Sequence, residues 1–101
     1  MAYEGGALDS TIAAASGGDE ALYRELRGAF LESADRQLDL LHRARCDGNW
    51  RIAAMRLKGL ASSFHDESLL ALADEAADTV PGEPTVLRRI AAHLKILALT
   101  L

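Results

Sequence analysis

The sequence predicts an all-α protein, an antiparallel four-helix bundle with a short additional N-terminal helix. Alanine, leucine, arginine and glutamate dominate the composition, whereas the β-branched and aromatic residues that favour strands are few. Apolar residues recur at three- and four-residue steps over four segments, as they do on one face of a helix. Glycine and proline mark short connections between these segments. A chain of 101 residues has the size of one domain, so we expect a single core.

The first helix is expected from Leu8 to about Ala15. Because so short a helix is unstable alone, it should lie against the rest of the domain. Residues 1–6 are expected to form a flexible tail, since Gly5-Gly6 follows a terminus with little apolar content. The helical domain should therefore occupy residues 7–101.

The second helix should begin after Gly18, with Asp19 as its N-cap, and should run to about Arg45 as the longest of the five. Its apolar stripe consists of Leu22, Leu26, Ala29, Phe30, Ala34, Leu38 and Leu41. The third helix is expected from about Asn49 to Phe64. Its stripe consists of Trp50, Ala53, Leu57, Leu60, Ala61 and Phe64.

The fourth helix should start after Asp66 and stop before Pro81-Gly82, because proline and glycine end helices. Its inward residues are expected to be Leu69, Leu72, Ala73, Ala76 and Val80. Pro84 suits the first turn of the fifth helix. The stripe of that helix consists of Val86, Leu87, Ile90, Leu94, Leu97 and Leu101. We expect the following large residues in the core: Leu26, Phe30, Leu38, Trp50, Leu57, Phe64, Leu72, Ile90 and Leu94.

Charge and cysteine content restrict the partners and the compartment. The formal net charge of −4 disfavours nucleic acid and an anionic membrane surface as partners. No apolar run is long enough to span a bilayer, and the amino terminus lacks the pattern of a signal peptide. Cys46 is the one cysteine, so an internal disulfide is excluded, and no Cys/His cluster has zinc-ligand spacing. We expect a cytoplasmic monomer without metal or cofactor.

The outward side of the third helix departs from a purely solvating pattern. At about 100° per residue, the residues opposite the core stripe are Arg51, Met55, Lys58, Gly59 and Ser62. Glycine inside a helix costs up to about 1 kcal/mol relative to alanine. An outward Gly59 four residues after an outward Met55 therefore suggests close approach of another surface.

The stretch Trp50–Phe64 reads W-R-I-A-A-M-R-L-K-G-L-A-S-S-F. It resembles the signature of histidine-containing phosphotransfer (HPt) domains, A-H-x-L-K-G-x-A-x-x-[FL]-G. The segments Phe30–Glu32 and Leu69–Glu75 also stand where that family's pattern has them, so the resemblance covers nearly the whole chain from Leu8. It implies a helical bundle that exchanges phosphoryl groups with receiver domains of response regulators.

Two departures limit what the resemblance implies. Met55 stands where the family has its phosphoacceptor histidine, and a thioether has no nitrogen to accept a phosphoryl group. His65 replaces the glycine that follows the aromatic position, which affects the end of the third helix. By resemblance, Lys58 would lie beside the acceptor position, Gly59 would let a receiver domain approach closely, and Ser62 would add a polar contact.

Simpler interpretations exist for these residues. Met55 is also compatible with an isolated exposed apolar side chain, and Lys58 with an ordinary solvated charge. His42, His65 and His93 do not occupy the acceptor position, and we expect ordinary histidines there. Cys46 is expected to be inert, and Asp66-Glu67 to cap a helix rather than bind metal.

The sequence contains no motif of a catalytic triad, a catalytic carboxylate pair or a phosphate-binding loop, so we do not expect an enzyme. Three hypotheses for the function remain. The leading hypothesis is an HPt-like module that docks a receiver domain or a histidine kinase without carrying phosphate. The second is a scaffolding bundle that binds no receiver. The third, less favoured, is an active phosphotransferase that uses a displaced histidine.

Overall fold

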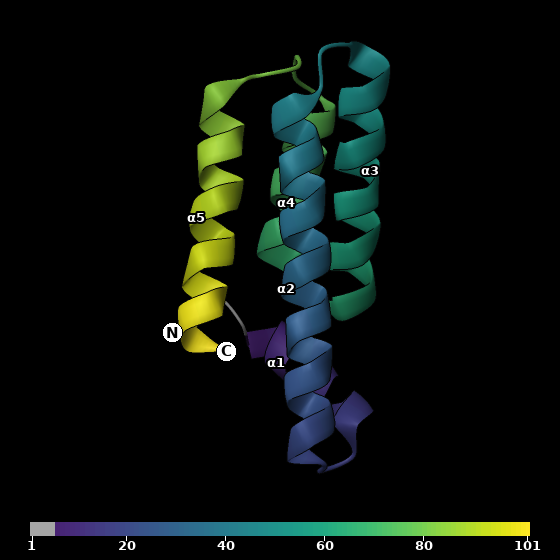
Figure 1. Cartoon of the computed structure of the whole chain (residues 1–101), viewed down its shortest axis with the longest axis vertical. Coiled ribbons are helices and arrows are strands. Elements are labelled where there is room, and N and C mark those ends of the chain that lie inside the picture. The colour runs from purple at the N-terminus through teal and green to yellow at the C-terminus, as the bar shows by residue number, and fades with distance from the viewer. Residues whose placement is uncertain (1–5) are drawn as a thin grey trace.

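The computed structural model describes residues 6–101, which form five α-helices and no strand. The all-helical prediction is therefore confirmed over this range. The elements are α1 (Gly6–Ser16), α2 (Glu20–Arg43), α3 (Asp47–Phe64), α4 (Glu67–Ala77) and α5 (Pro84–Thr100). Figure 1 shows α2, α3, α4 and α5 running side by side, with α1 beside the lower half of α2. None of these helices is both long enough and apolar enough to cross a membrane.

The helix α1 begins earlier than expected. Gly6 was assigned to the tail, but it belongs to α1, where the Ser10 hydroxyl donates to the Gly6 carbonyl at 3.1 Å. The rest of the expected tail, residues 1–5, lies outside the described part of the chain. Leu8 and Ile12 are fully buried, so α1 contributes two large side chains to the core.

The helix α2 begins where the sequence indicates. The Asp19 carboxylate accepts hydrogen bonds from the amides of Ala21 and Leu22 at 3.0 and 3.2 Å, which confirms it as the N-cap. The helix ends at Arg43 rather than Arg45. The chain turns at Ala44, whose backbone is extended and whose side chain is buried in the core.

The helix α3 is attached to α4 by a buried tryptophan. It begins at Asp47, two positions before the expected Asn49, and ends at Phe64 as expected. Its indole anchor is Trp50, which is 1% exposed and donates through Nε1 to the carbonyl oxygen of Ala76 at 2.7 Å. A buried indole N–H needs such a partner, so this bond fixes α3 against the last turn of α4.

The turn after α3 uses a backbone conformation that favours glycine. His65 has φ of 62° and ψ of 37°, which is the left-handed region. Histidine is among the few residues besides glycine that are enriched there, and its amide caps α3 by donating to the carbonyl of Ser62 at 3.3 Å. Histidine at position 65 is therefore compatible with the end of α3.

The helix α4 is shorter than expected, and Val80 does not face the core. The helix ends at Ala77, and Val80 is 64% exposed, so its inward assignment is wrong. Val80 precedes Pro81, whose ring disfavours helical backbone in the preceding residue. The helical stripe therefore stops before it reaches this position.

The helix α5 begins at Pro84, as predicted, and Glu83 is its N-cap. The Glu83 carboxylate accepts hydrogen bonds from the amides of Val86 and Thr85 at 2.8 and 3.1 Å. These two bonds, the one from Val86 first, lower the pKa of Glu83 because they favour the charged form. This contribution of the cap is present at neutral pH and is lost as the pH falls through the lowered pKa.

The core agrees with the helical stripes in most positions. Phe30, Trp50, Leu57, Leu72, Ile90 and Leu94 are buried, as predicted. Leu26, Leu38 and Phe64 are only partly buried and pack against the core. Phe64 reaches α2, where its ring centroid lies 5.0 Å from that of Phe30. Leu22 and Ala29 are exposed, so the stripe of α2 is narrower than the sequence indicates.

One partly buried polar side chain lies within the apolar stripe of α2. The Oε1 atom of Gln37 is buried and has no hydrogen-bond partner among residues 6–101. Phe30, Ala34 and Leu41 of the same helix are all fully buried. Gln37 lies between them at the spacing of a core position. Its amide oxygen is therefore a source of instability within the fold.

Replacing Gln37 with leucine should stabilise the protein. Removal of an unsatisfied buried acceptor should raise the free energy of unfolding by about 1–2 kcal/mol, and thus the melting temperature by about 4–8 °C per kcal/mol. Thermal and denaturant melts measure this. Glu32→Leu, at an exposed position of α2, is the control and should change stability by less than about 0.5 kcal/mol. A lower melting temperature for Gln37→Leu would contradict this account.

Candidate functional site

The outward surface of α3 brings most of the predicted site residues together. Arg51, Met55, Gly59 and Ser62 are exposed on this helix, and Lys58 is half-buried beside them. We call the exposed residues of this surface the α3 face. Its members are Gly48, Arg51, Ile52, Met55, Arg56, Gly59 and Ser62.

Met55 lies at the centre of the α3 face. Its side chain is 49% exposed, which is high for a long apolar residue. At about 100° per residue, Gly48, Gly59 and Ser62 lie within about 40° of its direction. Gly59, one turn further along, therefore leaves that side of Met55 uncovered, whereas Arg51, one turn earlier and also about 40° away, is a long neighbour.

Three members of the α3 face, Gly48, Ile52 and Arg56, are absent from the set predicted from the sequence. Ile52 is 51% exposed and, with Arg56, borders the side of Met55 that faces α2. The signal that was available is angular, because Ile52 lies only about 60° from Met55 around the helix.

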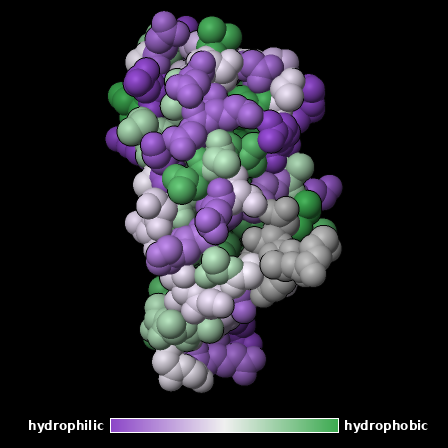
Figure 2. Space-filling model, turned by 180° about the vertical axis from the view of Figure 1, so that it is seen from behind, coloured by the Kyte–Doolittle hydropathy of each residue, from purple (hydrophilic) through white to green (hydrophobic). Residues whose placement is uncertain are grey.

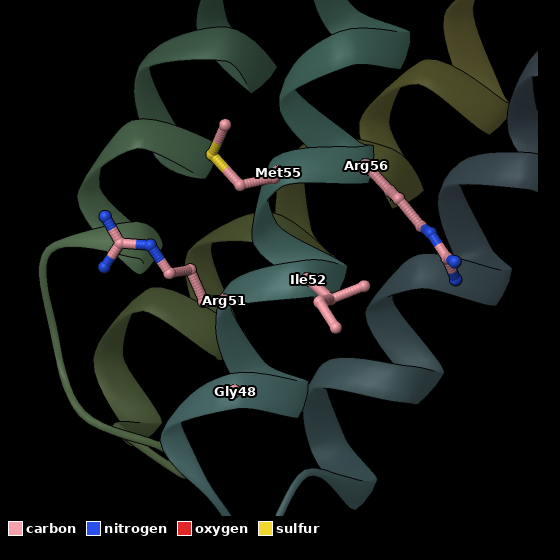
Figure 3. A pocket seen from close by; sticks show the side chains of 5 residues that line it. All are labelled: Gly48, Arg51, Ile52, Met55 and Arg56. Carbon is pink, nitrogen blue, oxygen red and sulfur yellow. The ribbon is translucent and has the colours of Figure 1, made fainter.

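The surface around Met55 is a shallow hollow rather than a cleft. The hollow measures about 520 Å³ and is lined by Gly48, Arg51, Ile52, Met55 and Arg56. All five belong to α3, so no second helix forms an opposing wall. Figure 3 shows Arg51 and Met55 extending to one side of the helix and Ile52 and Arg56 to the other. This geometry suits a docking surface better than a small-molecule site.

Lys58 has a partner within the protein. Its ammonium nitrogen lies 2.7 Å from Oδ1 of Asp74 on α4. Both side chains are about half exposed, so the ion pair is worth at most about 1 kcal/mol. The resemblance places the charge of Lys58 beside the acceptor position. In the structure, Asp74 of α4 partly neutralises that charge.

Gly59 is not required by packing within the chain. A Cβ atom built at this position would meet nothing within 4 Å. The same holds for Gly28, a glycine inside α2. The fold therefore gives no internal reason for glycine at either position. Gly59 is exposed and Gly28 partly exposed, so Gly28 can serve as the control position on another helix.

The three histidines lie away from Met55 in different environments. His42 is exposed near the end of α2. Nδ1 of His65 lies 3.0 Å from the Thr11 hydroxyl of α1. His93 is 5% exposed, and its Nε2 lies 2.8 Å from Oδ2 of Asp66, which is 1% exposed. None of the three occupies the acceptor position.

Asp66 is a helix cap, as the sequence predicts. Its Oδ1 accepts from the Leu69 amide at 3.1 Å, while its other oxygen contacts His93. No group of three or more metal-ligating side chains is found within residues 6–101. Cys46 is exposed at the N-cap position of α3, where its side chain makes no capping hydrogen bond.

The rest of the surface is mixed in character. Figure 2 shows the molecule from behind, with small hydrophobic patches among hydrophilic side chains. Comparison with protein-family models, curated proteins and solved structures gives no match to this chain.

Asp66→Ala should destabilise the protein more than Asp19→Ala. Both variants lose a helix cap, which costs about 1 kcal/mol, but Asp66→Ala also leaves the buried His93 without this partner. We expect losses of about 2–4 kcal/mol and about 1 kcal/mol, respectively, in urea unfolding. Equal losses would show that the contact with His93 contributes no stability.

Proposed function

We propose that this chain is an HPt-like module of a two-component phosphorelay that docks a receiver domain, or a histidine kinase, without carrying phosphate. In this proposal α2–α5 form the antiparallel four-helix bundle and α1 is the additional helix. The module acts as a cytoplasmic monomer and as a competitor or adaptor for its partner. Arg51, Met55, Lys58, Gly59 and Ser62 are the proposed contact residues.

The observation that carries the proposal is the half-exposed Met55 at the centre of the α3 face. The resemblance assigns the phosphoacceptor to this position, and the structure gives the position the exposure that docking requires. Gly59 lies one turn further along, exposed and free of internal contacts. A thioether at this place supports contact with a partner but no phosphoryl transfer.

One observation favours the second candidate, a scaffolding bundle that binds no receiver. Lys58 is held at 2.7 Å by Asp74, so part of its charge serves the α3–α4 contact. If position 58 is a lysine because of this ion pair, the match of Lys58 to the HPt signature says nothing about binding partners. Binding experiments with receiver domains separate the two candidates.

Incubation with phosphorylated receiver domains or with an active histidine kinase should leave no phosphohistidine on the protein. Met55 has no acceptor nitrogen, and His93 is buried against Asp66. Labelling with ³²P followed by acid treatment detects such a group, and Met55→His should gain some acceptance if the surroundings are intact. Acid-labile label on His42, His65 or His93 of the unchanged protein would contradict the proposal.

Gly59→Gln should abolish receiver binding, whereas Gly28→Gln should not. Both substitutions replace an interior helix glycine that has open surroundings, so each should stabilise its helix by up to about 0.5–1 kcal/mol. Only Gly59→Gln places a side chain in the open space beside Met55. Calorimetric titration against purified receiver domains from the same organism measures binding, and melts verify folding. If the two variants and the unchanged protein bind alike, the α3 face is not the docking surface.

A further inference from the structure

The two arginines of the α3 face have no partner within residues 6–101. Three other cations are paired: Lys58 with Asp74, Arg89 with Glu75 and Arg43 with Asp39. Arg24, Arg88 and Lys95 also form no ion pair within residues 6–101, but they lie on α2 and α5, away from the α3 face. Arg51 and Arg56 form no such ion pair and no side-chain hydrogen bond in this part of the chain. Their guanidinium groups are therefore available to carboxylates of another molecule.

These arginines lie on opposite sides of an apolar centre. Around the helix, Arg51 lies about 40° to one side of Met55 and Arg56 about 100° to the other. Ile52 lies between Met55 and Arg56, so the exposed apolar pair has a cation on each flank. Figure 3 shows the two guanidinium groups directed away from each other.

We infer that the α3 face selects an acidic amphipathic helix of its partner. Apolar side chains of that helix would lie on Ile52 and Met55, and a carboxylate on each side would pair with Arg51 or Arg56. The inference rests on the proposed function, because it uses the same face. It goes further by assigning charge recognition mainly to these arginines rather than to Lys58, which Asp74 already holds.

Shape and chemistry favour a helix as the occupant. The face belongs to one helix and has no opposing wall, so it suits an elongated partner lying along α3. Guanidinium groups bind carboxylates through paired hydrogen bonds, and exposed ion pairs of this kind weaken with salt. A partner with acidic flanks is therefore bound, and one with basic flanks is repelled.

Three fluorescein-labelled helical peptides test this inference. Each has about 18 residues, the length of α3, with the same leucine stripe and with glutamate, glutamine or lysine on both flanks. Fluorescence anisotropy at low salt should show binding of the glutamate peptide about tenfold tighter than that of the glutamine peptide, and none of the lysine peptide. Amide shifts in ¹⁵N spectra should be confined mainly to α3. Equal affinity for the glutamate and glutamine peptides, or shifts away from α3, would overturn the inference.

Substitutions then test which arginines bind the glutamate peptide. Arg51→Gln and Arg56→Gln should each weaken binding of the glutamate peptide at least about threefold. Arg24→Gln is the matched control, because Arg24 is exposed in the first turns of α2, at the end remote from α3's start. It should change binding by less than about 1.5-fold. Equal effects of the three substitutions would show that net charge alone is recognised and would overturn the inference.

The outcome also separates this inference from the proposed function. If the glutamate peptide binds as expected and no receiver domain does, the charge recognition stands and the phosphorelay role is wrong. If receiver domains bind the unchanged protein and both arginine variants equally well, the phosphorelay role stands and this inference is wrong.

Discussion

Asp66 joins α3, α4 and α5 at one point, and the relative placement of these three helices depends on its bonds. Its amide donates to the carbonyl of Ala61 at 2.9 Å and so closes the end of α3. One carboxylate oxygen caps α4, and the other contacts His93 of α5. Because all three bonds come from one buried residue, α3 ends in a fixed relation to α4 and α5.

Local signals allowed most of the fold to be predicted. Asp19, Asp66 and Pro84 stand at helix starts because capping and the first-turn position depend on neighbouring residues only. Val80 shows where such reasoning fails, since apolar spacing continues through it although α4 already ends at Ala77 and Pro81 disfavours helical backbone at Val80. The contact between Asp66 and His93 was not predictable, because it joins residues 27 positions apart through tertiary packing.

The candidate site was predictable to the extent that one helix defines it. The angular positions of Arg51, Met55, Gly59 and Ser62 follow from helical periodicity, and all four are exposed. The ion pair of Lys58 with Asp74 depends on where α4 lies, which no spacing within α3 reveals. The sequence can therefore locate the surface, but only the fold shows which of its cations are free of ion pairs.

The buried position of Trp50 makes the protein convenient to observe. This is the one tryptophan in the chain, and its indole is packed between α3 and α4 on the side of α3 opposite Met55. Its emission spectrum therefore reports whether these two helices are joined, with little response to a molecule that lies on the α3 face. Intrinsic fluorescence and surface labels accordingly follow two separate events, the integrity of the interior and the occupation of the exterior, in one sample.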